Sequence, residues 1–203
     1  FVYDAESNEK LVYKILYVSS ENDTNSALSI IDPKPNSHGW QSAGNCKYPQ
    51  EILLELKKPC KLRQIKILSH QLKIATKVDI FITAPMNYVL RKLGTIYFDK
   101  NEKNNYKSRE LKTIKTECDC DKIRFIFDKN YINKQNKFNQ IGIISIELYG
   151  EYISGKQKKR MKLTKQIQLL NQLKNAAAAK DKYEEAKAVK AKIDELEQKV
   201  IEL

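Results

Sequence analysis

Few residues of this chain have the chemistry that catalysis needs. It contains two histidines, His38 and His70, and four cysteines among its 203 residues. No Ser–His–Asp or Cys–His arrangement and no HExxH motif is apparent, and six glycines make a phosphate-binding loop improbable. His70 falls at the end of an expected strand, which favours a hydrogen-bonded edge residue over a general base. We therefore predict that the protein is not an enzyme and has no catalytic residue and no cofactor.

The cysteines and acidic residues make weak metal sites. Cys118 and Cys120 are separated by one residue, whereas a zinc half-site needs two or more between its ligands. We interpret them as structural thiols in a turn. Asn22, Asp23 and Asp32 could lie near a calcium ion, but capping of turns is the favoured role for such residues. No metal is therefore predicted.

The charge of the chain indicates an acidic partner. The net charge is +12, which suits a nucleic acid, a membrane surface or an acidic cytoskeletal polymer. No signal peptide is visible and no apolar run reaches the ~20 residues that span a bilayer, so we expect a cytoplasmic protein with reduced thiols and no membrane partner. The basic residues are dispersed without a nucleic-acid motif, so a nucleic acid is not expected either.

Two clusters of cations are the candidate partner contacts. One lies in the asparagine-rich segment 129–139, where aromatic residues accompany the lysines, although its asparagines are equally natural turn formers. The other lies just after residue 155 and is either a solvated linker or an electrostatic contact. The predicted contacts are Lys129, Lys134, Lys137, Lys156, Lys158, Lys159 and Arg160.

The elements that must position these residues are strands up to about residue 152. Short segments rich in β-branched and aromatic residues alternate with turn residues, and we count eight or nine strands without a helical pattern. This pattern predicts a mainly β jelly-roll sandwich over 11–152, after an N-terminal tail over 1–10. Turns are expected at 57–60 and 118–121. Trp40 should plug one end of the core.

The character of the sequence changes after Tyr152. Residues 153–160 read as a basic linker, and 161–203 lack proline and glycine and are rich in alanine, lysine, glutamate and leucine. The apolar positions form two stripes whose heptad repeats are out of register with each other. Asp181 with Glu184 fits a capping box at the start of the second stripe. We predict helices over about 161–179 and 182–203 that fold as a hairpin, with one continuous coiled-coil helix as the alternative. The helices could pair within the chain or between chains.

Several sequence blocks occur together in a known family. The chain resembles the N-terminal domain of the centrosomal protein 104 family from about Tyr17 to Gly150. Its join between sandwich and helices is shorter than the animal pattern. The blocks are Trp40-Gln41-Ser42, Cys46-Lys47-Tyr48-Pro49-Gln50-Glu51-Ile52, Cys60-Lys61-Leu62-Arg63, Leu68-Ser69-His70-Gln71, Leu93-Gly94, Arg109-Glu110-Leu111-Lys112 and Asn133-Lys134-x-Asn136-x-x-Asn139-Gln140.

This resemblance implies a discoidin-like jelly roll followed by a coiled-coil segment. It implies a cytoskeletal protein of the centriole, basal body and axoneme tip in the cilium, with tubulin or other ciliary-tip proteins as partners. The resemblance does not assign a ligand to the jelly roll. The alternative function is a galactose-binding-like module for a glycan or calcium, although segment 20–25 offers no exposed aromatic residue for a sugar.

Overall fold

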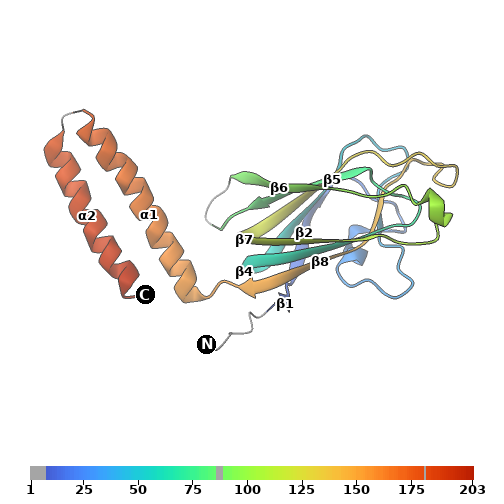
Figure 1. Ribbon diagram of the computed structural model, residues 1–203, viewed down its shortest axis with the longest axis horizontal. Coiled ribbons are helices and arrows are strands. Elements are labelled where there is room, and N and C mark those ends of the chain that lie inside the picture. Colours follow the sequence, from blue (N-terminus) through green and yellow to red (C-terminus); the bar gives the residue numbers. More distant parts are fainter. Residues whose placement is uncertain (1–7, 86–88, 181) are drawn as a thin grey trace. The chain divides into compact units, whose positions relative to one another are not determined.

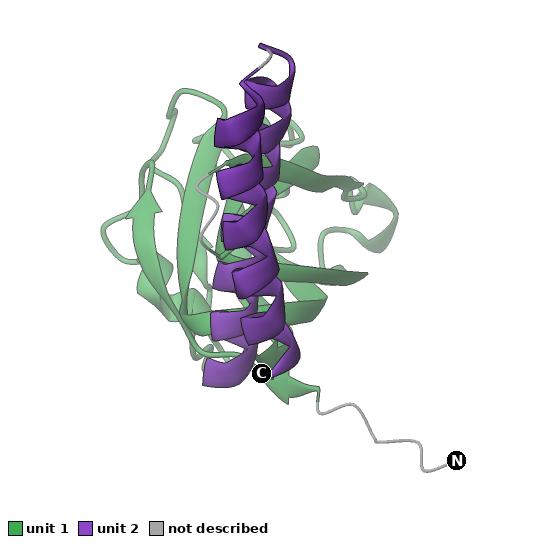
Figure 2. Cartoon of the chain, turned by 90° about the vertical axis from the view of Figure 1, so that its left-hand side faces the viewer, with its two compact units in different colours: residues 1–152 green, residues 153–203 purple. Residues whose placement is uncertain are grey.

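The computed structural model describes residues 8–85, 89–180 and 182–203 (Figure 1). The chain divides into two compact units, Phe1–Tyr152 and Ile153–Leu203, which Figure 2 colours green and purple. The first unit is built from antiparallel strands and the second from two helices, so the predicted mainly β fold class with two C-terminal helices is confirmed.

The first unit contains eight strands and two short 3₁₀ helices within the described residues. The predicted tail over 1–10 needs correction in part. Its residues 1–7 lie outside the described part, but Glu9 and Lys10 pair with the last strand as β1. The elements are β1 (Glu9–Lys10), β2 (Tyr13–Val18), η1 (Ala27–Ile30), β3 (Trp40–Gln41), β4 (Gln50–Ser69), β5 (Lys77–Thr83), β6 (Leu90–Tyr97), η2 (Glu102–Asn104), β7 (Leu111–Phe127) and β8 (Gly142–Tyr152).

Two long strands, β4 and β7, join the two layers of the sandwich. Their halves at 50–55 and 122–127 pair with each other between β2 and β5, whereas their other halves pair with each other beside β8. The predicted turn at 57–60 is therefore wrong. Residues 56–59 of β4 bulge opposite Asp121, and there β4 changes its neighbour from β2 to β8. Proline is tolerated at such a bulge, which accounts for Pro59 inside a strand.

The predicted turn at 118–121 is wrong for the same reason. Cys118, Asp119 and Cys120 lie within β7 and pair with β4 across the bend. A short polar segment resembles a turn locally, but its pairing across the sheet makes it a corner of the sandwich.

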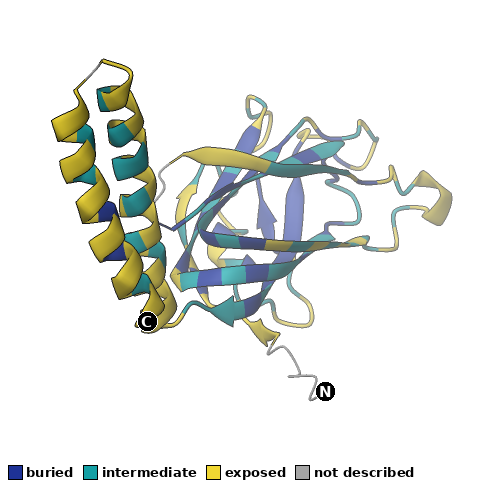
Figure 3. Ribbon diagram, turned by 60° about the vertical axis from the view of Figure 1, so that its left-hand side comes forward, coloured by how far each residue is buried: buried dark blue, intermediate teal, exposed yellow. Residues whose placement is uncertain are grey.

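The core of the sandwich lies between these layers, where Figure 3 shows the buried residues in dark blue. Val78, Ile80 and Ile82 alternate inward along β5, as their period of two predicts. Trp40 is fully buried, its ring centroid 5.5 Å from that of Phe127, and its indole Nε1 donates to the Ser20 carbonyl oxygen at 2.9 Å. The indole ring of Trp40 therefore lies in the core beside the loops, and its one polar atom is hydrogen-bonded.

The second unit is a helical hairpin of α1 (Gly155–Ala178) and α2 (Tyr183–Ile201), which lie side by side in Figures 1 and 2. The single continuous helix is thus excluded. The predicted linker over 153–160 is also wrong. Ser154 and Gln157 form a capping box that starts α1 at Gly155. The predicted cap, Asp181, lies outside the described residues. In the described parts of the chain, neither helix is apolar over the length that crossing a bilayer requires.

Candidate interaction site

The segment between β7 and β8 is a loop that its own asparagines hold in shape. Asn136 is 3% exposed, and its side chain donates to the Gln140 carbonyl oxygen at 2.7 Å and accepts from the Gln140 amide at 3.1 Å. Asn133 accepts from the backbone amides of Gln135 and Asn136 and donates to the Leu72 carbonyl oxygen at 2.9 Å. The asparagines therefore build the loop internally, which leaves other side chains to face solvent.

The outward side chains of this loop are basic and apolar. The predicted contacts Lys129, Lys134 and Lys137 are all exposed and lie on this one loop. Ile132 is 87% exposed and Phe138 is 61% exposed. Our reading of the sequence missed Ile132, because one apolar residue in a polar segment does not predict whether it points inward or outward.

Ile132 lies on the border of two surface hollows. One, of about 520 Å³, is lined by Ile132, Asn133, Lys134 and Gln135 of this loop and by Glu102 and Tyr106 of the neighbouring loop. The other, of about 340 Å³, is lined by Ile132, Lys129, Asn130 and Asn139 of the same loop and by Asn45, Cys46 and Tyr48. This arrangement can hold side chains of a partner on either side of one exposed apolar residue.

The second cluster of cations lies in the first turns of α1. Lys156, Lys158, Lys159 and Arg160 are all exposed, and the whole helix contains no acidic residue. Because the positive end of the helix dipole lies at the N-terminus, cations there oppose helix formation and acidic residues would be favourable. The structure places these four cations on one helix and the three loop lysines on one loop, each set in a unit of its own.

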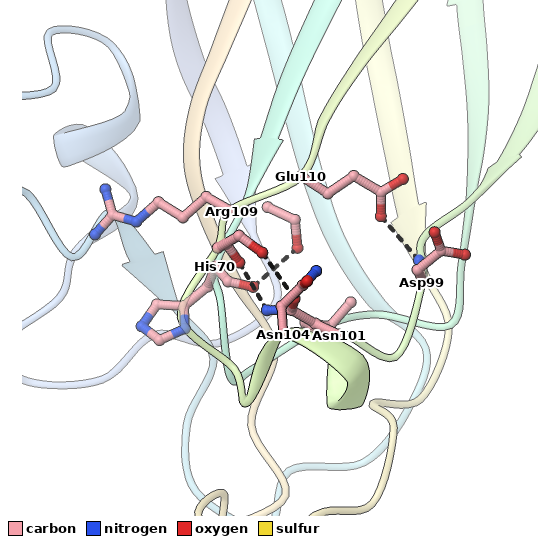
Figure 4. A pocket seen from close by; sticks show the side chains of 9 residues that line it. His70, Asp99, Asn101, Asn104, Arg109 and Glu110 are labelled. Atoms are coloured by element: carbon pink, nitrogen blue, oxygen red, sulfur yellow. Dashed lines mark hydrogen bonds between the residues drawn. The ribbon is translucent and has the colours of Figure 1, made fainter.

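His70 lines a cavity of about 200 Å³ beneath the loop of residues 99–110 (Figure 4). Its Nδ1 accepts from the backbone amides of Leu72 and Lys73 at 3.0 and 3.3 Å, so the ring proton lies on Nε2. Burial, together with the charges of Lys73 and Arg109, lowers the pKa of His70 from 6.5 to about 4. His70 is hydrogen-bonded, as predicted, but it is only 4% exposed and is neutral at pH 7.

The other side chains around this cavity brace the surrounding loops. Asn101 donates to the carbonyl oxygens of Gln71 and Ser108 at 3.0 and 2.7 Å, and it accepts from the Ser108 hydroxyl at 3.0 Å. Arg109 donates to the Gln71 side chain at 3.0 Å and to the Ser37 carbonyl oxygen at 3.1 Å. These bonds connect segments distant in sequence, so the network chiefly fixes the shape of this end of the sandwich.

The cysteines and the turn residue Asn22 make contacts that support the fold. Cys60 and Cys120 are buried across β4 and β7 with their Sγ atoms 3.8 Å apart. Their mutual hydrogen bond and burial raise the pKa of Cys120, which keeps it a thiol at neutral pH. Asn22 accepts from the amide and hydroxyl of Thr24, which is the turn-capping role. Among the described residues, no three His, Cys, Asp or Glu side chains cluster as a metal site would require.

Comparison with known proteins identifies relatives of the first unit. The family model described as "Centrosomal protein CEP104, N-terminal domain" matches residues 39–150. Centrosomal protein of 104 kDa from Homo sapiens is 29% identical over 150 residues, and that from Mus musculus is 31% identical over 150 residues. Each match covers 70% of this chain, and the chain spans 16% of the length of these relatives.

Solved structures share the fold at low sequence identity. A family 32 carbohydrate-binding module of NanJ from C. perfringens, in complex with galactose, has 18% identity and a TM-score of 0.55, with 68% of this chain and 93% of that chain covered. Reduced XRCC1 bound to the DNA polymerase β catalytic domain has 11% identity and a TM-score of 0.56, with 70% and 99% covered. At such identities the likeness shows the β-sandwich fold alone.

Proposed function

This chain belongs to the centrosomal protein CEP104 family, and from that membership we propose a non-enzymatic role at the tips of axonemal microtubules. In this role the protein resides at centrioles, basal bodies and the axoneme tip, where it supports cilium assembly or tip structure. The sandwich and the helical hairpin bind tubulin or other tip proteins through their exposed cations.

The single observation that carries the proposal is the cationic start of α1. Lys156 and Lys158 lie in the first turn of α1, where the dipole disfavours positive charge. Lys159 and Arg160 follow directly, and no acidic residue of α1 compensates these four cations. Local rules of helix construction are most often broken where a function requires it. An acidic polymer surface would supply the missing counter-charge, and the surface of tubulin is acidic.

The loop between β7 and β8 supports the same proposal from the first unit. Lys129, Lys134 and Lys137 project from a backbone that Asn133 and Asn136 hold by hydrogen bonds. Such an arrangement offers positive charge at little cost in ordering on binding. Attraction of this kind acts over roughly 8 Å at physiological salt and should weaken as salt rises.

Co-pelleting of residues 1–203 with microtubules tests the proposal. We expect pelleting at low salt and weaker pelleting at physiological salt, because exposed charges are screened. Reversal of the four helix cations to glutamate should reduce pelleting strongly, and reversal of the three loop lysines should reduce it further.

The matched control for the loop is a pair of exposed lysines elsewhere on the sandwich. Lys57→Glu/Lys58→Glu changes the net charge as much as Lys134→Glu/Lys137→Glu, but at the bend of β4. Equal losses in the two pairs would mean that net charge alone drives pelleting. An absence of pelleting at either salt concentration would refute direct binding to microtubules.

Self-association through 161–203 is part of the proposal. Leu169 and Leu173 are 58% and 52% exposed and lie one turn apart on α1, so a second copy could cover them. Light scattering should give the mass of a dimer, and Leu169→Glu/Leu173→Glu should give that of a monomer. A monomeric mass for the unchanged chain would refute self-association through 161–203.

The second candidate is a galactose-binding-like module for a glycan or calcium. The polar cavity beside His70 favours its glycan form, and no cluster of metal ligands among the described residues supports its calcium form. A bound ligand would raise the melting temperature by mass action. A thermal-shift series with galactose and with calcium separates the two functions, and no shift at millimolar ligand would exclude the second.

A further inference from the structure

Ile132 and Phe138 expose apolar surface from a loop that is held rigidly. Ile132, at 87%, is the most exposed large apolar residue in the described part of the chain, and Phe138, at 61%, lies on the same loop. Phe138 lies over the backbone at Gly44, where a Cβ would approach the Phe138 Cβ to 3.2 Å, and its carbonyl oxygen accepts from the Asn45 amide at 2.7 Å. Phe138 is therefore held in position and does not swing freely in solvent.

The hollow between this loop and the loop of residues 99–110 has an aromatic wall. Tyr106 lines it with φ of +58°, a left-handed conformation that is rare for a bulky residue. The amide of Tyr106 donates to the Asn101 carbonyl oxygen at 3.1 Å, and the Asn101 side chain is bonded to Gln71 and Ser108. The loop network thus holds Tyr106 opposite Ile132 and Lys134.

The charges around these apolar residues are mostly positive. Lys134 lines the larger hollow and Lys129 lines the smaller one, with Lys137 next to Phe138. Glu102 is the one acidic residue among those that line the two hollows in the described part of the chain. A second copy of this loop would repel the first, whereas an acidic partner would be attracted.

We propose that Ile132, Phe138 and Tyr106, with Lys129, Lys134 and Lys137 around them, form a docking site for an acidic segment of a partner protein that carries a bulky apolar residue. The proposal deepens the proposed function, on which it rests, by naming the chemistry of a tip protein that this loop would recognise. The apolar residue of the partner packs against Ile132 in the larger hollow, and its acidic residues pair with the lysines. A buried apolar anchor with a charged rim is the usual arrangement of such interfaces. Concave hollows on both sides of Ile132 fit peptide side chains better than they fit a lipid surface.

Selection of short random peptides on the chain of residues 1–203 tests the proposal. We expect enrichment of peptides that combine acidic residues with one bulky apolar residue. An enriched peptide is then synthesised and its affinity measured by fluorescence anisotropy. Ile132→Ser/Phe138→Ser should weaken binding by about tenfold or more, as loss of a central anchor does. Lys134→Glu/Lys137→Glu should weaken it by a similar factor at low salt and by less at high salt.

Controls separate the site from folding and from net charge. Ile132 and Phe138 are exposed, so their serine variants should keep the melting temperature of the unchanged chain. Lys57→Glu/Lys58→Glu should alter peptide affinity by no more than about twofold, because these lysines lie away from the loop. No enrichment, peptides that bind the serine variant equally well, or binding to anionic phosphatidylserine vesicles in place of peptides would each overturn the proposal.

Microtubule co-pelleting distinguishes this proposal from the one on which it rests. Loss of peptide binding in Ile132→Ser/Phe138→Ser with unchanged pelleting would support a docking site separate from the lattice contact. If the unchanged chain pellets with microtubules but enriches no peptide, only the proposed docking site is refuted. Peptide binding without pelleting would instead remove only direct attachment to microtubules.

Discussion

The sandwich and the hairpin differ in how completely they bury their apolar residues. In the sandwich, Phe125, Phe127, Ile65 and many other side chains are fully inaccessible. In the hairpin only Ile193 and Leu196 are buried among the described residues, and they remain 4% and 8% exposed. Figure 3 shows the hairpin mostly in the colours of exposed and partly buried residues.

This difference indicates where each unit obtains its stability. The two β layers of the sandwich bury a core between them. In a pair of helices, each helix can bury only the one stripe of its surface that faces the other helix. The hairpin therefore depends more on helix propensity, caps and ion pairs, such as those of Glu195 with Lys192 and Lys199. Hydrogen bonds to these lysines lower the pKa of Glu195 to about 2, so the pairs persist in moderate acid.

The largest expected effect comes from a cavity in the sandwich. Phe125→Ala should lower the free energy of unfolding by about 4 kcal/mol, because Phe125 is fully buried and stacked on Phe127. Denaturant unfolding followed by Trp40 fluorescence measures the loss. Helical circular dichroism should persist beyond this transition, and simultaneous loss of both signals would contradict the separation of the two units.

Acid should destabilise the sandwich before it affects the hairpin. The pKa of His70 is about 4 in the folded state and 6.5 in the unfolded chain, so the unfolded chain binds the proton first as pH falls. Its contribution is intact above pH 6.5 and is lost towards pH 4, by up to about 3 kcal/mol. His70→Asn, which keeps an acceptor for the Leu72 and Lys73 amides, should lose less stability between pH 7.5 and pH 4.5, as urea unfolding measures.

The acid loss of stability in His70→Asn decides the cause of this pH dependence. If His70→Asn lost as much stability in acid as the unchanged chain does, burial of a neutral His70 would not be the cause.

A smaller loss is expected from the hairpin seam. Leu196→Ala should lower the stability of the helices by about 2 kcal/mol, because Leu196 is one of its few buried side chains. Thermal unfolding followed by helical circular dichroism measures this change. The unfolding transition reported by Trp40 fluorescence should stay at the same temperature. Ile201→Ala is the matched control, since Ile201 is 75% exposed and its loss should cost little.

The smallest effect concerns the start of α1. Ser154→Ala removes the acceptor for the Gln157 amide and should cost about 1 kcal/mol. Ser154→Asp keeps the acceptor and adds a charge that the helix dipole favours, so it should retain or increase helix stability. Equal stability of the two variants would show that the cap contributes little beside the packing of α1 on α2.

Local patterns predicted the elements whose features are local. The alternation of Val78, Ile80 and Ile82 predicts a strand where the structure has β5, and the two apolar stripes after residue 161 predict a hairpin. The cap formed by Ser154 and Gln157 has a readable sequence signature that our interpretation passed over in favour of a linker. The predicted contact lysines are exposed, while their role in binding stays a prediction.

The bends, the burial of His70 and the outward position of Ile132 could not be predicted in this way. Each depends on contacts between residues distant in sequence: Cys60 with Cys120, His70 with Gly142, and Asn133 with Leu72. A proline beside lysines looks the same in a turn and in a bulge until the opposing strand is known.

The sequence by itself thus determined the fold class, the division into strands and helices, and the family. These follow from periodicity, composition and blocks of neighbouring residues, which the chain carries in its order. Only the tertiary structure decided which layer each half of β4 and β7 joins, that His70 is buried and neutral, and that Ile132 faces solvent among lysines. The physical reason is that burial and exposure result from long-range pairing, which no short segment specifies.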